Sequence, residues 1–260
     1  MQQFNALLLK EWRDSWRSFK LIWIPLVFLL LGVSDPLMNY FMEDILHAVG
    51  NMPEGFEMLI PELKPADLLI ASTGQFQLIG IIVLIAAYIG TFSRERQNGT
   101  ATLLYVRPIS FRALFLSKWI VASIVAVISA IAGYAGSMYY TALLYGTVDG
   151  TKFLAMVGTY CVWLTFVMAL TIAMSAAFQT AVAATITIVL IPFGLLIDQI
   201  IGGFWAVSPW KLPNYGLALL TESALMENYW WTFGLVAGLT VAIIVFGIVM
   251  SKQNSSKVKI

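Results

Sequence analysis

The sequence predicts an all-α integral membrane protein with six transmembrane helices. Of its 260 residues, 60% are apolar and only 11% are charged, and the mean hydropathy is +0.83. A soluble domain carries about 25% charged residues, so lipid must cover much of this chain's surface. Apolar segments in lipid must be helices or closed barrels. The apolar runs here are too long and too uniform for barrel strands, which leaves helices.

Six runs meet the length of about 20 mostly apolar residues that a transmembrane helix needs. They are Leu21–Phe41, Gln75–Phe92, Leu116–Tyr145, Phe153–Phe178, Ala181–Phe204 and Trp230–Met250. The first run is interrupted by Asp35-Pro36, and the third is longer than one bilayer.

Residues 1–20 are expected to form an amphipathic interfacial elbow helix ahead of a transmembrane domain over residues 21–260. One helical face carries Phe4, Leu8, Trp12, Trp16 and Phe19. The opposite face is expected to carry Lys10, Arg13, Arg17 and Lys20. Such a helix lies in the lipid headgroup layer, which makes Trp12, Trp16, Arg13 and Arg17 predicted membrane-surface anchors. The elbow could in addition touch a cytoplasmic partner.

The basic residues predict the orientation. With the N-terminus, the loop after the second span and the C-terminus on one side, that side holds twelve of the fifteen Lys and Arg residues. The other side holds Lys64, Lys152 and Lys211. Cytoplasmic loops are the ones enriched in Lys and Arg. A multi-pass protein of the cell membrane with both termini in the cytoplasm is therefore expected.

Two connections are predicted to contain short helices. In the loop 93–115, Leu103, Leu104 and Val106 suit a cytoplasmic coupling helix that Pro108 ends, and Ser110 is expected to cap the helix that begins at Phe111. The outer segment 205–229 is rich in Trp and Tyr, typical of a membrane interface. There Pro209 and Pro213 are expected to break the chain, and Leu217–Leu225 could form a re-entrant helix that dips into the outer leaflet.

The loop after the second span also carries an ordered set of motifs. These are Arg94-Glu95-Arg96, Gly99-Thr100, Leu103-Leu104, Arg107-Pro108-Ile109-Ser110 and Lys118. The set resembles the cytoplasmic loop of ABC-2-type permeases, the membrane subunits of ATP-binding-cassette exporters. In that family a glutamate near the inner end of span 2 is followed by Gly-Thr, Leu-Leu, Pro-hydrophobic-Ser and a lysine. The resemblance extends to chain length, six spans and the elbow.

The resemblance implies a permease subunit that exports cargo with energy from a separate cytoplasmic ABC ATPase. ATP and magnesium would bind to that partner, and no cofactor is expected on this chain, which has no Gly-x-x-x-x-Gly-Lys-Ser/Thr phosphate loop. The expected neighbours in the membrane are lipid and a second copy or a sister permease. Because the spans contain few charges, the cargo is expected to be hydrophobic or amphipathic.

The resemblance also implies which residues couple this chain to the ATPase. They are Arg94, Glu95, Arg96, Gly99, Thr100, Arg107, Pro108, Ser110 and Lys118. Glu95 is the acidic residue of this basic loop, and two roles are open for it. It could neutralise Arg94 or Arg96, or it could pair with a basic group on the ATPase or on the elbow helix.

Two carboxylates lie within the predicted spans. Burying an ionisable group in a membrane is costly, so such a group is first considered as part of a functional site. Asp35 and Asp198 are therefore candidates for a translocation path. Alternatively, Asp35-Pro36 marks a helix break at which the carboxylate caps the next turn, and Asp198 simply reaches the interface. No metal site is expected around His47, the single histidine. The net charge of +1 gives no reason to expect nucleic-acid binding.

Two other functional classes compete with the exporter. An ion-coupled transporter or channel would place polar groups and broken helices at the membrane midplane, but the predicted spans 2, 4 and 6 contain no charged residue. A membrane scaffold or sensor would transport nothing and would dock a cytoplasmic protein through residues 93–115.

Overall fold

The computed structural model describes residues 2–42, 44–45, 63–98, 110–221 and 226–255. These parts of the chain are helical and contain no β-strand. Six of the described helical segments are long and apolar enough to cross a membrane. They are Lys20–Tyr40, Pro65–Gln97, Phe111–Leu144, Gly150–Ala177, Thr180–Phe204 and Glu227–Asn254. The predicted all-α class and the six spans are confirmed.

The helices follow one another in a simple order. The first is the elbow helix α1 (Gln2–Arg17), which precedes α2 (Lys20–Tyr40). The second span comprises α4 (Pro65–Gln75), the π-helix η1 (Phe76–Gly80), α5 (Ile81–Tyr88) and α6 (Ser93–Gln97). The next two spans are α8 (Phe111–Leu144) and α9 (Gly150–Ala177). The fifth comprises α10 (Thr180–Ile188), η2 (Val189–Phe193), α11 (Gly194–Ile201) and η3 (Gly202–Phe204). The last elements are η4 (Pro209–Lys211), α12 (Leu212–Ala218) and α13 (Met226–Ser255).

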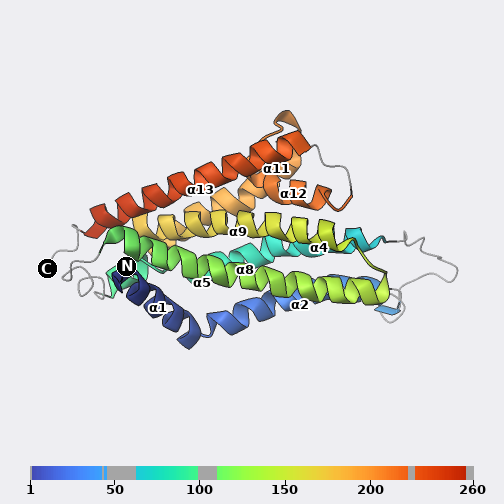
Figure 1. The fold of residues 1–260 in the computed structure, drawn as a ribbon, viewed down its shortest axis with the longest axis horizontal. Helices are drawn as coiled ribbons and strands as arrows, with labels where there is room; N and C mark the ends of the chain where they lie inside the picture. The colour runs from blue at the N-terminus through green and yellow to red at the C-terminus, as the bar shows by residue number, and fades with distance from the viewer. Residues whose placement is uncertain (1, 43, 46–62, 99–109, 222–225, 256–260) are drawn as a thin grey trace.

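The spanning helices run side by side along the long axis of the molecule (Figure 1). Helices α8 and α9 are the most enclosed, since 61% of the residues in an 18-residue apolar stretch of each are buried. The same measure is 11% for α13, which lies at the periphery. Helix α1 and the C-terminal end of α13 lie at the same end of the bundle (Figure 1). We call this the termini end.

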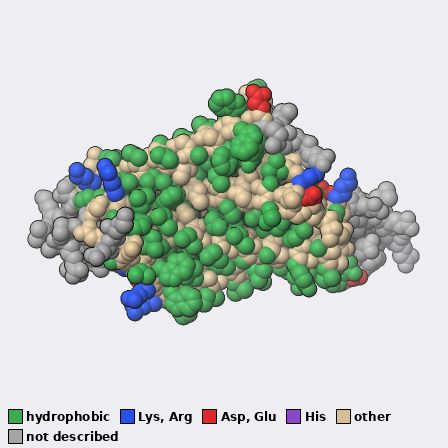
Figure 2. All heavy atoms as spheres, in the orientation of Figure 1, with side chains coloured by type: hydrophobic (Ala, Val, Ile, Leu, Met, Phe, Trp, Pro, Cys, Tyr) green, Lys and Arg blue, Asp and Glu red, His purple; other side chains and the backbone are tan. Residues whose placement is uncertain are grey.

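The outer surface is suited to lipid. On the face shown in Figure 2, hydrophobic side chains cover the middle of the molecule and Lys and Arg side chains lie toward the two ends of the long axis. Leu78, Ile131, Ile200, Val241 and Val245 are among the many large apolar side chains that are exposed. An exposed apolar belt between two charged ends is the pattern expected of a bilayer-spanning bundle.

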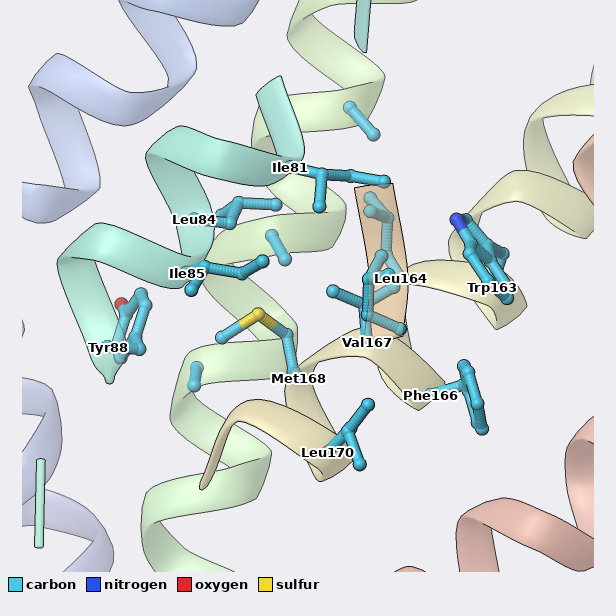
Figure 3. Close-up of a cluster of buried hydrophobic side chains, with 14 of the residues drawn as sticks. Ile81, Leu84, Ile85, Tyr88, Trp163, Leu164, Phe166, Val167, Met168 and Leu170 are labelled. Atoms are coloured by element: carbon cyan, nitrogen blue, oxygen red, sulfur yellow. The ribbon is translucent and has the colours of Figure 1, made fainter. Parts of the chain in front are cut away.

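The centre of the bundle is a packed apolar cluster. Figure 3 shows Ile81, Leu84 and Ile85 of α5 lying toward Leu164 and Val167 of α9, and these side chains are buried. The second span is thus held against the fourth over its C-terminal half, so the chain that leaves it at α6 starts from a packed helix.

A close backbone contact joins α2 to α8. A Cβ atom on Gly32 would lie 2.1 Å from the carbonyl oxygen of Gly133, and one on Gly133 would lie 2.8 Å from the carbonyl oxygen of Phe28. Glycines allow helices to approach this closely in membranes. The small residues of these spans therefore serve packing within one subunit, as Ala126 and Ala130 do in the interior of the same helix.

The predicted interruption of the first span is wrong, since α2 continues through Asp35 and Pro36 to Tyr40. A proline inside a helix leaves the carbonyl four residues earlier without its amide donor. That carbonyl belongs to Gly32, and the hydroxyl of Ser72 on α4 donates a hydrogen bond to it over 3.5 Å. A neighbouring helix thus satisfies the free backbone group, which is how proline is tolerated within membranes.

The predicted outer helix Leu217–Leu225 is also misplaced. The short helix is α12, from Leu212 to Ala218, and Pro213 lies in its first turn. Proline has no amide hydrogen and a fixed φ suited to a first turn, so it begins this helix instead of breaking it. Residues 222–225 lie outside the described part of the chain, and the dip into the outer leaflet stays a prediction.

Candidate functional site

A network of four charged side chains lies at the termini end of the bundle. Lys118 of α8 donates to Glu11 of α1 and to Glu95 of α6, with both Nζ–Oε1 distances at 2.8 Å. Lys10 of α1 donates to the same two carboxylates, with both distances at 3.0 Å. The network therefore joins the elbow helix, the segment that leaves the second span and the entrance to the third span.

Burial decides how strongly this network acts. The side chain of Lys118 is 1% exposed, that of Glu11 10% and that of Glu95 23%. Burial alone would raise the pKa of Glu11, but the ammonium groups of Lys118 and Lys10 hold that pKa below its ordinary value. Burial would likewise lower the pKa of Lys10, but Glu11 and Glu95 raise it. Glu11 and Lys10 are therefore both charged at neutral pH.

The elbow helix turns a partly polar face toward the bundle. Leu7, Glu11 and Ser15 follow one another at four-residue intervals and are buried. Lys10 and Lys20, predicted to face the headgroups, also make contacts within the bundle. Lys10 joins the network, and Lys20 donates to the carbonyl oxygen of Ala87 at 2.7 Å. Partners inside the bundle outweigh the helical periodicity that the sequence suggests.

The four predicted anchor residues differ in exposure. Trp16, Arg13 and Arg17 are exposed, and Trp12 is half-buried. The chain turns from α1 into α2 at Phe19, whose φ of 55° is the one positive value at a non-glycine residue in the described part. Anchoring in a membrane surface stays a prediction for these four residues.

Arg96 closes the end of a neighbouring helix. Its guanidinium donates to the carbonyl oxygens of Ser175, Ala176 and Phe178 at the end of α9. The hydroxyl of Ser175 in turn accepts from the backbone amides of Phe92 and Ser93 at the start of α6. Segment α6 is thus fastened to α9 as well as to α1 and α8.

The other predicted coupling residues are spread over this end of the chain. Arg94 and Ser110 are exposed. Helix α8 begins at Phe111 and Ser110 occupies its N-cap position as predicted, but the Ser110 side chain makes no capping hydrogen bond. Gly99, Thr100, Arg107 and Pro108, together with the predicted helix at Leu103, Leu104 and Val106, lie outside the described residues.

Glu95 pairs with the elbow helix through Lys10, one of the partners considered for it, and with Lys118 as well. The structure also identifies two residues that the sequence reading missed as site members, Glu11 and Lys10. A signal was available, because Glu11 shares a helical face with Leu7 and Ser15. An acidic residue on that face predicts a cationic partner inside the bundle.

Asp35 lies at the other end of the bundle, near the C-terminal end of α2. Its Oδ1 accepts from the side-chain amide of Gln75 at 2.6 Å, and Ser34 donates to the Oε1 of the same glutamine at 3.1 Å. The interpretation of Asp35 as the cap of a broken helix is wrong. Its Oδ2 is buried without a hydrogen-bond partner among the described residues.

Asp198 is buried in α11 and paired. Its Oδ1 accepts from the indole nitrogen of Trp205 at 2.8 Å, and its Oδ2 lies 3.5 Å from the Nζ of Lys211. Its side chain is only 3% exposed, so Asp198 is enclosed by protein, which the interpretation that it simply reaches the interface did not predict. Beside it is a mainly apolar cavity of about 490 Å³ between the fifth span and the outer segment, lined in part by Leu190, Ile197 and Trp210.

The elements above define a class: a six-span helical membrane subunit whose elbow helix is fastened by buried charges to the segment between its second and third spans. The sequence profile of the ABC-2 family transporter proteins matches residues 5–213. The chain belongs to this family. It is also similar to the uncharacterized transmembrane protein YxlG of Bacillus subtilis (strain 168), with 32% identity over 184 residues that cover 71% of each chain.

Proposed function

We propose that this chain is the permease subunit of an ATP-driven exporter, powered by a separate cytoplasmic ABC ATPase that carries ATP and magnesium. Two permease subunits, identical or sister chains, would line the path in the cell membrane. The observation that carries the proposal is the buried network of Lys10, Glu11, Glu95 and Lys118. It makes α1, α6 and the start of α8 one mechanical unit at the end of the bundle where ATPase docking is expected.

A push on the loop after α6 would reach two spans at once. Arg96 fastens α6 to the end of α9, and Glu95 fastens it to α8 through Lys118. Because Lys118 is buried, its part is to hold this unit together and not to touch the ATPase. Contact with the ATPase is assigned to the exposed Arg94 and to the predicted coupling residues 99–110.

The cargo is proposed to be hydrophobic or amphipathic. The cavity of about 490 Å³ beside Asp198 supports this, because apolar side chains form most of its wall. Its one buried carboxylate is already paired with Lys211, which leaves an apolar surface as the main recognition element.

The test is purification of the tagged chain from its native membranes, identification of the ATPase that accompanies it, and reconstitution of the complex in liposomes. Glu95→Ala and Gly99→Val are expected to insert normally, since neither alters an apolar span, and to weaken ATPase binding or uncouple hydrolysis from transport. Glu227→Ala, at an exposed acidic residue at the start of α13, is the matched control and is expected to behave as wild type.

Three outcomes would overturn parts of this proposal. Transport that persists when the ATPase is inactivated would favour an ion-coupled transporter. An ATPase partner without any transported cargo would favour a scaffold or sensor. Wild-type binding, turnover and transport in both variants would remove the loop after α6 from the coupling mechanism.

A further inference from the structure

A second, polar cavity lies beneath the elbow helix. It measures about 230 Å³, and its wall includes Asp14 and Ser15 of α1, Lys20 at the start of α2, and Tyr88 at the end of α5. The network residues Glu11, Glu95 and Lys118 close its inner side. We infer that this cavity binds the headgroup of a membrane phospholipid that carries both a phosphate and a primary amine, the chemistry of phosphatidylethanolamine.

The wall of this cavity has buried polar and charged side chains, as a binding site for a polar ligand requires. Three of its side chains are charged or polar and more than nine-tenths buried: Lys118 at 2% exposure, Tyr88 at 4% and Glu11 at 8%. The hydroxyl of Tyr88 is buried beside Ser15 and makes no hydrogen bond of good geometry within the described residues. A buried polar group in this state is costly, so a bound polar molecule that reaches it would lower the energy of the protein.

A second feature of the cavity is its charge. Lys118 is neutralised by Glu11 and Glu95, which leaves Lys20 and Asp14 as the charges available to a ligand. Lys20 donates to the carbonyl of Ala87 and lies 4.4 Å from the centre of the Tyr88 ring, and no carboxylate in the described part of the chain pairs with it. Within the described residues, the ion pair that Asp14 makes is with Lys10, at 3.7 Å. An ammonium without a salt bridge in that part of the chain and a weakly paired carboxylate match the phosphate and the amine of a zwitterion.

A third feature of the cavity is its size and place. A volume of about 230 Å³ holds several water molecules, which is room for the eight non-hydrogen atoms of phosphoethanolamine. Lys20 is the first residue of a candidate spanning helix, which is where the headgroups of the leaflet at the termini end are expected. The neighbouring Trp16, Phe19 and Ile22 are exposed and offer an apolar surface to acyl chains. Both facts favour a lipid over a soluble phosphoamine.

The test is native mass spectrometry of the full chain released from nanodiscs that contain equal amounts of phosphatidylethanolamine, phosphatidylcholine and phosphatidylglycerol. Wild type is expected to retain the ethanolamine lipid about tenfold more than either competitor, the effect of one charge-assisted hydrogen bond. Phosphatidylcholine has no N–H to donate to Asp14, and phosphatidylglycerol has no amine.

The variants separate the two halves of the headgroup. Lys20→Met should lower retention of the ethanolamine and choline lipids alike, whereas Asp14→Asn should abolish the preference between these two. Arg13→Met should match wild type, because it removes an exposed cation of α1 that does not line the cavity. Asp14→Asn carries the test if Lys20→Met does not fold, because the Asp14 side chain is 57% exposed.

Equal retention of the three lipids by wild type would overturn the inference. So would a loss in Arg13→Met as large as that in Lys20→Met, which would indicate a diffuse surface attraction. Displacement of the retained lipid by free phosphoethanolamine at equal concentration would overturn the assignment to a lipid. None of these outcomes bears on ATPase coupling, which the reconstitution experiment tests separately.

Discussion

At the residue scale, the central feature is a lysine buried between two carboxylates. Taking a charge out of water is costly, and attraction within the protein repays the cost only when the partners are in place. Lys118 meets this condition through Glu11 and Glu95, and the residual charge of Glu11 is balanced by Lys10. Removal of one member therefore leaves a buried charge with too few partners, whereas removal of a matched pair does not.

The first prediction is a double-mutant cycle on this pair. Glu11→Met and Lys118→Met should each lower the free energy of unfolding by about 1–3 kcal/mol, because each leaves a buried charge undercompensated. The double variant retains the balanced pair of Lys10 and Glu95 and should lie within about 1 kcal/mol of wild type. Unfolding in SDS or by heat measures all four proteins. A double variant as unstable as the sum of the single ones would show that the pair is held by packing and not by charge.

The second prediction concerns pH. An acid with a lowered pKa contributes stability above its unfolded pKa, about 4.3 for glutamate, and loses it as pH falls through the folded value. The pKa of Glu11 is lowered, so its contribution should be complete above about pH 5 and vanish in more acidic solution. Lys10 has a raised pKa, so its contribution is complete below the unfolded value of about 10.4 and is lost only as pH rises through the still higher folded value.

Thermal unfolding of wild type and Glu11→Gln from pH 3 to pH 9 checks this. The difference between their midpoints should be constant from about pH 5 to pH 9 and should shrink below about pH 4. A difference that changes markedly between pH 6 and pH 8 would contradict the sign of the shift and would point to a neutral Glu11 in the folded protein.

At the element scale, the helices divide into those that the sequence alone places and those that depend on neighbours. The long spans could be predicted because a run of about 20 apolar residues in lipid has no alternative to a helix. The continuity of α2 could not, because it depends on Ser72 of another helix reaching the Gly32 carbonyl freed by Pro36. The start of α12 at Pro213 shows the same ambiguity, since proline both ends and begins helices.

The residues of the candidate site also divide into those that the sequence indicates and those that depend on neighbouring helices. Glu95 and Lys118 were singled out by motif and position, and the elbow was one of the partners considered for Glu95. Glu11 was not singled out, because its importance arises only when α1 lies against α8. The contacts of Lys10 and Lys20 within the bundle could not be predicted, because helical spacing reports the pattern of one helix and not the partners that neighbouring helices provide.

The third prediction tests the contact between α2 and α8. Gly32→Val would place a side chain against the backbone oxygen of Gly133, where a Cβ atom would lie only 2.1 Å away. Because a backbone atom cannot swing aside, the helices must separate, at an expected cost of about 3 kcal/mol or more. Gly158→Val in α9 is the matched control, since a Cβ atom there meets nothing within 4 Å. The fraction of monodisperse protein and its unfolding midpoint measure both, and equal behaviour of the two variants would contradict the close packing.

At the scale of the whole molecule, six spans bring α1 and the end of α13 to the same end of the bundle (Figure 1). The network of Lys10, Glu11, Glu95 and Lys118 lies at that end as well. If this end faces the cytoplasm, the elbow, the loop after α6 and both chain termini are available to an ATPase. If it faces outward, the proposed coupling is impossible. The orientation is therefore the property on which the functional proposal depends most.

The last prediction is that the termini end is cytoplasmic. Twelve of the fifteen basic residues lie on the side of the termini and the loop after the second span, and such loops stay on the inside of the membrane. Single cysteines at positions 55 and 255, in a chain in which Cys161 is replaced by alanine, report the two sides. In intact cells an impermeant thiol reagent should label position 55 and should reach position 255 only after the membrane is opened. Labelling of position 255 in intact cells would place the charge network outside, and the elbow and α6 would then have no ATPase to meet.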